Sequence, residues 1–343
     1  MKKISHSLPT LGLSEIYAVG KAVFTNDLAT GLILKKFEKL LCLKLNRKFC
    51  IAISSGTGAI HLALKANSIG ANDEVIVSGY SCVDIYTAIN LANANVKVAA
   101  VDKYGNLDIK SLDKIISDRT KAIIVQHTFG RRVRGLEIIK SQYPNIIIIE
   151  DCTHSVFPIL ENSDVILSLG ATKFFTAAEA GIYMTNIKKN YEFADNRINT
   201  TSINRLPYIL SDIHAAIGIC QLKKLGNFIQ KRLEIKKEYD EIFDTHVDTV
   251  DVGTDFCYRY VIKTSGLEHT NQLIEELLRH GISSGRPVDP PNEITYQCNK
   301  IKDIYNSFLS IPIYPKLKKR KVRKIAKIIL EFNKKRGYKY DLL

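Results

Sequence analysis

The sequence contains no apolar run long enough to cross a lipid bilayer. Its first twenty residues, MKKISHSLPTLGLSEIYAVG, begin with two lysines, but the uninterrupted apolar stretch of a secretory signal peptide does not follow. Closely spaced cysteines are also missing. The seven in the chain form no CxxC pair and do not cluster with histidine: Cys42, Cys50, Cys82, Cys152, Cys220, Cys257 and Cys298. We therefore expect reduced thiols, no metal site and a cytoplasmic protein.

Two common nucleotide-binding signatures are absent as well. The chain has neither a Walker A loop nor a GxGxxG motif, which disfavours ATP and NAD as ligands. What remains is a chain of 343 residues, 45% hydrophobic and 24% charged. This composition is typical of a globular protein with one large domain or two moderate ones.

The formal net charge of +14 raises the possibility of an anionic partner: nucleic acid, a membrane surface or a phosphorylated small molecule. The densest basic run, KLKKRKVRKIAKIILEFNKKRG, carries apolar residues at helical spacing. It is therefore interpreted most simply as a packed amphipathic helix with a solvated cationic face. Because no groove-reading motif accompanies it, we do not expect nucleic acid as a partner.

Short β-branched segments recur along the first half of the chain, with helical patterns at 58–67, 81–93 and 108–118 between some of them. Nearly continuous apolar segments are typical of strands buried on both faces. The alternation predicts an α/β fold with a mostly parallel sheet flanked by helices, and ligands at the carboxyl ends of its strands. The predicted strands are 48–55, 73–79, 96–102, 121–128, 145–151, 164–170 and 181–186.

The pattern changes after Asn186. A long helical segment begins near Ser211 and leads to a smaller α+β region, in which YRYVIKT predicts a strand and HTNQLIEELLRHG a helix. We expect a large domain at 1–246, including an N-terminal segment and the long helix, and a small C-terminal domain at 247–343.

The segment SSGTGAIHLAL follows a predicted strand and opens a predicted helix. Gly56 and Gly58 allow a tight turn with exposed N–H groups, Thr57 adds a hydroxyl, and a helix N-terminus favours an anion. A phosphate is one interpretation. A glycine turn with a helix cap is the other, and this short motif alone does not decide between them.

The segment NIIIIEDCTH delivers two acids and a histidine to a strand end: Glu150, Asp151 and His154. An acid directly after such an apolar strand needs a partner when it leaves water, which indicates a site. Capping of a following helix by Asp151 is the alternative.

Lys173, in SLGATKFFTAAEAG, lies between small and apolar residues. Low-polarity surroundings lower a lysine pKa and favour the neutral, nucleophilic amine of Schiff-base lysines. An ordinary lysine that extends its amine to water is the alternative. Ser168, at the preceding strand end, could reach the same phosphate as Gly56 and Thr57. Together these residues supply an anchor, a ring-nitrogen partner and an amine for pyridoxal phosphate.

Several longer segments, taken together, resemble one family. They are FEKLLCLKLNRKFCIAISSGTGAIHLAL, NDEVIVSGYSCVDIYTAI, RTKAIIVQHTFG, IIIIEDCTHS, SLGATKF, SDIHAAIGICQLKKL and FLSIPIYP. They are similar to the DegT/DnrJ/EryC1/StrS family of pyridoxal-phosphate sugar aminotransferases. The resemblance covers nearly the whole chain and implies fold type I, a homodimer and nucleotide-linked keto sugars as substrates.

Residue by residue, the resemblance implies that Lys173 is the Schiff-base lysine and Asp151 the partner of the pyridine nitrogen. The other cofactor-binding positions that it implies are Gly56, Thr57, Gly58, Cys82, His154 and Ser168. It further implies pyridoxal 5'-phosphate (PLP) and its amino form (PMP) as cofactor, with glutamate as donor. The chain departs from the family where an aromatic residue usually stacks on the ring. Cys82 stands there, so we expect weaker packing or a contribution from Tyr80.

Further departures concern the neighbouring subunit and the substrate. Pro207 and Ile209 stand where an Asn and an Arg usually reach the partner's site, and Ala178 and Ala180 replace glycines of the usual GEGG, although Glu179 remains. The segment GISSGRPVDPPNEI lacks the common HYP signature, so it does not imply a particular sugar.

The expected activity is amino transfer to a nucleotide-linked keto sugar, for surface polysaccharide or related amino-sugar biosynthesis. Arg131, Arg132 and Arg134 are candidates for steering that anion, with a solvated loop as the alternative. A sugar dehydratase is one rival, but such family members carry His at the Schiff-base position. A non-catalytic binding or scaffold protein is another, and a basic nucleic-acid-binding protein a third.

Overall fold

The computed structural model describes residues 3–289, 291 and 299–338. Its largest element is a sheet of seven strands in the order β1-β7-β6-β5-β4-β2-β3. Within this sheet only β7 runs antiparallel to its neighbours, so the predicted α/β fold with a mostly parallel sheet is confirmed. The strands are β1 (Phe49–Ile53), β2 (Glu74–Ser78), β3 (Asn95–Ala99), β4 (Thr120–Gln126), β5 (Ile147–Asp151), β6 (Asp164–Ser168) and β7 (Gly181–Thr185).

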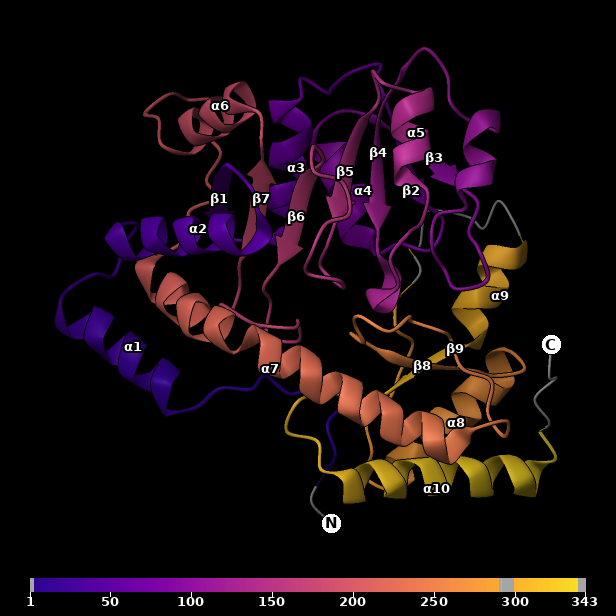
Figure 1. Cartoon of the computed structure of the whole chain (residues 1–343). Coiled ribbons are helices and arrows are strands. Elements are labelled where there is room, and N and C mark those ends of the chain that lie inside the picture. The colour runs from indigo at the N-terminus through magenta and orange to yellow at the C-terminus, as the bar shows by residue number, and fades with distance from the viewer. Residues whose placement is uncertain (1–2, 290, 292–298, 339–343) are drawn as a thin grey trace.

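Helices cover both faces of this sheet, which is why most residues of its strands are apolar and buried. Every residue of β2 and of β7 is buried. One face packs on α3, α4 and α6 and the other on α2, α5 and α7 (Figure 1). The α-helices are α1 (Leu13–Phe24), α2 (Leu32–Leu45), α3 (Gly56–Ala66), α4 (Val83–Leu91), α5 (Leu136–Gln142), α6 (Lys188–Ile198), α7 (Asp212–Phe243), α8 (Leu267–Arg279), α9 (Asn299–Ser307) and α10 (Lys319–Arg336).

The helix predicted at 108–118 is wrong in type and length. The structure has only a 3-10 helix, η1 (Ile109–Lys114), and a second short one, η2 (Thr128–Gly130), follows β4. Asp108 accepts a hydrogen bond from the backbone of Lys110, and Ser111 donates its hydroxyl to the carbonyl of Asp108. Such local bonds compete with regular helix formation.

The smaller part of the molecule contains a two-stranded antiparallel sheet, β8 (Tyr260–Lys263) and β9 (Phe308–Ile311), with α8, α9 and α10 around it. The long helix α7 runs from beneath the large sheet to this smaller part (Figure 1). Buried side chains of α7 share one core with β8, β9 and α10. The domain boundary predicted after residue 246 therefore falls just beyond the end of α7.

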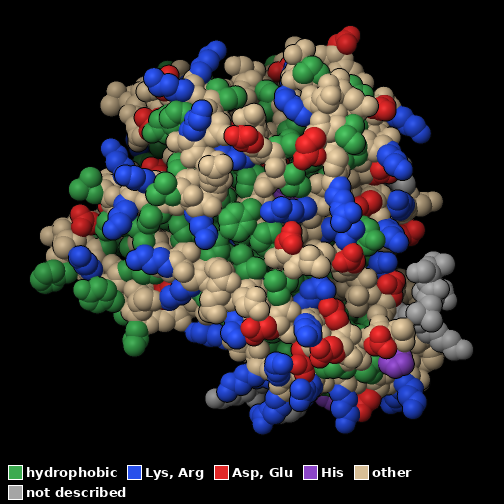
Figure 2. Space-filling model, in the orientation of Figure 1, with side chains coloured by type: hydrophobic (Ala, Val, Ile, Leu, Met, Phe, Trp, Pro, Cys, Tyr) green, Lys and Arg blue, Asp and Glu red, His purple; other side chains and the backbone are tan. Residues whose placement is uncertain are grey.

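The basic C-terminal segment folds as the amphipathic helix predicted for it. Val322, Ile325 and Ile329 of α10 are buried, and Lys and Arg side chains gather at the lower edge of the molecule, where α10 lies (Figure 2). Within the described ranges, no helix combines the length and the apolarity that a membrane span requires.

Candidate active site

Three neighbouring strands of the large sheet end in polar residues. Gln126 ends β4, Asp151 ends β5 and Ser168 ends β6, and in the sheet register Gln126 lies beside Asp151. These strands are parallel, so their carboxyl ends meet at one edge of the sheet. The topology thus gathers polar groups that are far apart in the sequence.

A cavity of about 480 Å³ lies at this edge. It is lined by residues from the large sheet, from the turn after β6 and from segments of the smaller part. Seven of the eight residues predicted to hold the cofactor line it: Gly56, Thr57, Cys82, Asp151, His154, Ser168 and Lys173. Gly58 is not among the lining residues, and its N–H donates to Oγ of Ser55, the N-cap of α3, at 3.1 Å.

The start of α3 lies directly against the end of β6. A Cβ atom on Gly56 would lie 2.9 Å from the Cβ of Ser168, so only glycine permits this approach. The helix N-terminus and the Ser168 side chain therefore face the same part of the cavity, as an anion site requires. The Thr57 hydroxyl instead donates to Asp84 Oδ1, at 3.0 Å, which brings a carboxylate to the cavity wall.

The two acids at the end of β5 have different surroundings. Glu150 is fully buried and accepts hydrogen bonds from His127 Nε2 at 2.9 Å and from the backbone N–H groups of Ile159 and Leu160. Asp151 lines the cavity and accepts a bond from the Thr153 N–H at 3.0 Å. Because side chains alternate along a strand, only Asp151 of this pair is available to a ligand.

Lys173 lies in the turn after β6, and its Nζ is 5.4 Å from the ring centroid of Tyr258. The flanking Phe174 and Phe175 are buried in the core, whereas Thr172 is exposed. The aromatic ring over the amine therefore comes from the smaller part of the molecule, and not from the neighbours in sequence that suggested a low-polarity environment.

His154 is held between two aromatic rings. Its imidazole stacks on Tyr258, with centroids 4.2 Å apart, and on Phe129, and its Nδ1 accepts the Phe129 N–H at 3.3 Å. Burial, together with the charges of Lys173 and Arg259, holds the pKa of His154 well below its usual value. The imidazole is thus neutral, with its proton on Nε2.

Cys82 differs from what ring stacking requires. Burial raises the pKa of the Cys82 thiol to about 11, so Cys82 presents a neutral thiol to the cavity. The expectation that Tyr80 could stack in its place is wrong. Tyr80 is 1% exposed and packs against Phe129, Tyr305 and Phe308 in the core between the two parts of the molecule.

The lining residues that were not predicted include four with polar or ionisable side chains, Asp84, Gln126, Tyr258 and Arg259. Gln126 ends an apolar strand in the same way as Asp151, so that signal was available in the sequence. Tyr258 and Arg259 lie in YRYVIKT, whose sequence pattern predicts only a strand and gives no indication of a site. Burial tends to raise the pKa of Tyr258, but the charges of Lys173 and Arg259 and a hydrogen bond with Thr172 outweigh it and lower the pKa to about 8.

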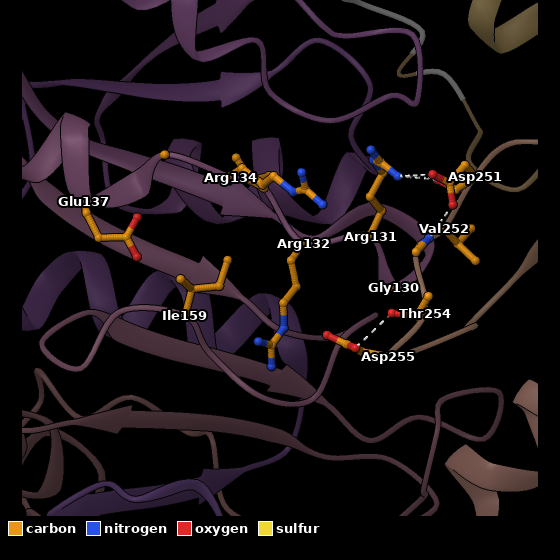
Figure 3. Close-up of a pocket in the computed structure, with 13 residues that line it drawn as sticks. Gly130, Arg131, Arg132, Arg134, Glu137, Ile159, Asp251, Val252, Thr254 and Asp255 are labelled. Atoms are coloured by element: carbon orange, nitrogen blue, oxygen red, sulfur yellow. Dashed lines mark hydrogen bonds and ion pairs between the residues drawn. The ribbon is translucent and has the colours of Figure 1, made fainter.

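Arg131, Arg132 and Arg134 line a different cavity, of about 510 Å³ (Figure 3). Arg131 is paired with Asp251 Oδ2 at 2.6 Å and stacks on Tyr104 at 3.8 Å, and Arg132 lies over the ring of Phe256. None of the three lines the cavity of Lys173. This arrangement favours the alternative of a surface loop over direct steering of a substrate to Lys173.

Comparison with known proteins identifies the family of the chain. The DegT/DnrJ/EryC1/StrS aminotransferase family matches residues 9–330. The chain belongs to this family. Among curated proteins, the GDP-perosamine synthase of Escherichia coli O157:H7 is 26% identical over 330 residues, which cover 88% of this chain and 90% of that protein.

Solved structures of other proteins share the fold. Helicobacter pylori PseC, an aminotransferase involved in the biosynthesis of pseudoaminic acid, has a TM-score of 0.89 at 23% identity and covers 97% of this chain and 100% of its own. Spr1654 of Streptococcus pneumoniae, solved in PLP and PMP forms, has TM-scores of 0.87 and 0.86 at 20% identity; 97% of this chain is covered, with 99% and 98% of the respective Spr1654 chains. The expectation of fold type I is confirmed, and PLP and PMP are the cofactor forms of the two Spr1654 structures.

Two departures from the family pattern have visible structural consequences. Ala178, in place of a family glycine, adopts a left-handed backbone with φ 66°, which strains a residue that carries a Cβ. Pro207 and Ile209 lie in an exposed segment, and Arg205 donates to the carbonyl of Ile198 at 3.1 Å. The segment predicted to contact the substrate extends to Ile294, and its residues 290 and 292–294 lie outside the described residues, as does Cys298.

Proposed function

We propose that this chain is a PLP-dependent aminotransferase that transfers an amino group from glutamate to a nucleotide-linked keto sugar. The observation that carries the proposal is that the amine of Lys173 and the carboxylate of Asp151 line one cavity together with the N-terminus of α3. The residues present fit the cofactor in kind: Gly56 at the N-terminus of α3 and Ser168 line the cavity together, as a phosphate anchor requires, and Asp151 offers a carboxylate for a ring nitrogen.

PLP, when bound, supplies a carbon that takes up an amino group and a ring that accepts electrons. Lys173 would hold that carbon through Nζ and, once released, move a proton as general base and then general acid. Asp151, as a carboxylate, would keep a proton on the ring nitrogen. Gly56 and Ser168 would anchor the phosphate. Neutral His154 offers the cavity one hydrogen-bond donor, its Nε2–H, because its Nδ1 accepts from Phe129.

The substrate class rests on the family and its members. GDP-perosamine synthase and PseC are each named for an amino-sugar product or its biosynthesis, which supports a keto sugar as acceptor and a role in surface polysaccharide or related amino-sugar pathways. Lys173 supports amino transfer over dehydration, and the ionisable groups around it support a catalytic protein over a scaffold. A cytoplasmic location remains a prediction; all six described cysteines are free.

The cofactor's own absorption provides the test. We expect the purified protein to bind PLP with visible absorption, glutamate to bleach that absorption, and Lys173→Ala to abolish it. Lys188→Ala, which changes a lysine paired with Glu192 on the surface of α6, is the matched control and should behave as wild type. Bound cofactor that no amino acid bleaches would point to a scaffold. Keto sugars can then be screened against the amino form.

We also propose a homodimer. Helix α1 presents apolar side chains to solvent, with Leu13 83%, Tyr17 73% and Phe24 88% exposed. Apolar side chains project at the left of the molecule in Figure 2, where α1 lies in Figure 1. Exposed apolar patches of this kind are typical of subunit interfaces. Light scattering should give the mass of two chains for wild type and of one chain for Leu13→Ser/Phe24→Ser. A monomeric wild-type protein would contradict the proposal.

A further inference from the structure

The cavity that contains Lys173 holds a second cation, Arg259, which directly precedes β8. Its guanidinium NH1 donates to Ser7 Oγ at 2.9 Å and contacts His6 Nδ1 at 3.1 Å. Four carboxylates line the same cavity, but among the described residues none forms an ion pair with Arg259 within 4.0 Å. The cation is thus held in place without a counter-charge.

Both partners of Arg259 are neutral. Burial, and next the charge of Arg259, lower the pKa of His6 to about 3, so its imidazole is uncharged at neutral pH. His6 Nε2 lies 2.8 Å from Ser310 Oγ, which leaves Nδ1 free to accept from Arg259. A neutral imidazole and a hydroxyl orient the guanidinium but do not balance its charge.

One guanidinium nitrogen also lacks a partner. Nε of Arg259 is buried and has no hydrogen-bond acceptor, as is also true of five other arginines among the described residues. An unsatisfied buried donor is costly. Because a guanidinium presents its N–H groups as a planar fork, a carboxylate is the anion that matches it with two parallel bonds.

Other arginines of the smaller part have partners and lie outside the cavity. Arg323 pairs with Glu238 at 2.6 Å, and buried Arg232, whose Nε also lacks an acceptor, donates to the carbonyl oxygens of Tyr258 and Ile313. Neither lines the cavity. Arg259 and Lys173 instead both approach the ring of Tyr258, with Cζ 4.9 Å and Nζ 5.4 Å from its centroid.

We propose that Arg259 is the carboxylate-binding residue of this active site and orients a substrate carboxylate while the reacting group is at Lys173. This inference rests on the proposed aminotransferase function. The carboxylate has two possible sources, the amino-acid donor and an acceptor sugar that carries an acid group. Both sources present the same planar anion to the same fork.

Equilibrium binding to the PLP-loaded protein, measured by calorimetry, tests this without turnover. In one arm the probe is glutarate, which has the carboxylates of glutamate but no amine. In the other arm UDP-glucuronate is compared with UDP-glucose, which differs by one carboxylate. If the amino-acid donor is the source of the carboxylate, Arg259→Gln should weaken the binding of glutarate about 10- to 100-fold. If the acceptor sugar is the source, the substitution should remove the preference for UDP-glucuronate over UDP-glucose.

Two further variants make the result interpretable. Arg259→Lys keeps the charge but not the fork, and should recover part of the lost affinity. Arg132→Gln removes an arginine outside this cavity and should bind both probes as wild type does. Because Arg259 also contacts His6 and Ser7, the unfolding midpoints of all variants should be compared with that of wild type. Unchanged midpoints show that a loss of probe binding does not come from loss of the fold.

The inference is overturned if Arg259→Gln binds glutarate as tightly as wild type does and also leaves the discrimination between UDP-glucuronate and UDP-glucose unchanged. Failure of the proposed function is a different result. It would appear as wild-type protein that does not bind PLP, or whose bound PLP glutamate does not bleach. If glutamate bleaches the PLP bound to wild type, but Arg259→Gln binds both probes as wild type does, only the proposed role of Arg259 is contradicted.

Discussion

The imidazole of His154 stacks on the phenol ring of Tyr258, with centroids 4.2 Å apart and ring planes inclined by 17°. His154 follows β5 of the large sheet, whereas Tyr258 lies just before β8 of the smaller part. The contact therefore joins the two parts of the molecule at the wall of the cavity. Lys173 approaches the same phenol ring, so the environment of the amine depends on how the two parts pack.

Tyr258 should ionise early in the cofactor-free protein. Its pKa is lowered to about 8 because the charges of Lys173 and Arg259 outweigh the effect of burial. The ultraviolet absorbance of tyrosinate should show one group titrating near pH 8, absent in Tyr258→Phe and shifted upward in Lys173→Ala. Tyr17→Phe, on the exposed face of α1, should leave this transition in place. No transition near pH 8 in wild type would contradict the placement of these charges.

Replacement of Asp84 should strengthen cofactor binding. Its carboxylate accepts the Thr57 hydroxyl and lines the cavity near the predicted phosphate position, so it would repel a dianionic phosphate. Asp84→Asn keeps an acceptor for Thr57 and should lower the apparent Kd for PLP about 3- to 10-fold, with a smaller difference at high salt. Equilibrium dialysis measures this. Asp118→Asn, before β4 at the opposite edge of the sheet, should not change the Kd, and an equal gain there would indicate a general charge effect.

Glu38 should make the folded protein less stable as the pH rises. Burial raises the pKa of its carboxyl from 4.5 to about 7, and its Oε1 accepts the Ala52 N–H at 2.8 Å. Between these pH values the unfolded chain loses a proton that the folded protein retains, so the free energy of unfolding falls across this window. Glu38→Gln keeps the acceptor and should raise that free energy by roughly 1–2 kcal/mol at pH 8.

Urea unfolding at pH 4.5 and pH 8 measures this effect. Glu38→Gln should lose most of the decline between the two pH values, whereas Glu241→Gln, on the exposed side of α7, should retain the wild-type decline. If the decline is the same in Glu38→Gln as in wild type, Glu38 is not its source.

Ala178→Gly should stabilise the protein. The left-handed backbone of Ala178 costs an alanine about 1–2 kcal/mol, which glycine avoids, while glycine adds flexibility to the unfolded chain. The net gain in free energy of unfolding should be roughly 0.5–1 kcal/mol, seen as a higher urea midpoint. Ala171→Gly, an exposed turn position outside the left-handed region, should instead lower the midpoint, and a gain in both would contradict the argument.

Much of the large domain was predictable because its signals are local. All seven strands of the large sheet lie where apolar, β-branched segments predicted them, since strands covered on both faces must be apolar along their length. Lys173, Asp151 and Ser168 were identifiable because polar groups at the ends of parallel strands meet at one edge. The prediction of a helix at 108–118 was wrong because local side-chain hydrogen bonds near Asp108 compete with regular α-helix formation.

The positions of Tyr80 and of the three arginines could not be predicted in this way. Tyr80 is close in sequence to a cofactor-binding position, yet its ring is buried between the two parts of the molecule. The segment η2 contacts His154 through the N–H of Phe129. The three arginines that follow η2, Arg131, Arg132 and Arg134, nevertheless line a separate cavity. Sequence proximity to a site does not determine the direction in which a side chain points.

The sequence by itself determined the α/β fold, the edge of the sheet that carries the site and the residue types of the anchor, the acid and the amine. Each of these follows from the pattern of a single strand and its end. Only the tertiary structure decided that Tyr258 and Arg259 close the cavity, that Asp84 approaches the anion site and that Glu150 is buried away from it. These relationships depend on how segments distant in sequence pack against one another, and no local periodicity encodes that packing.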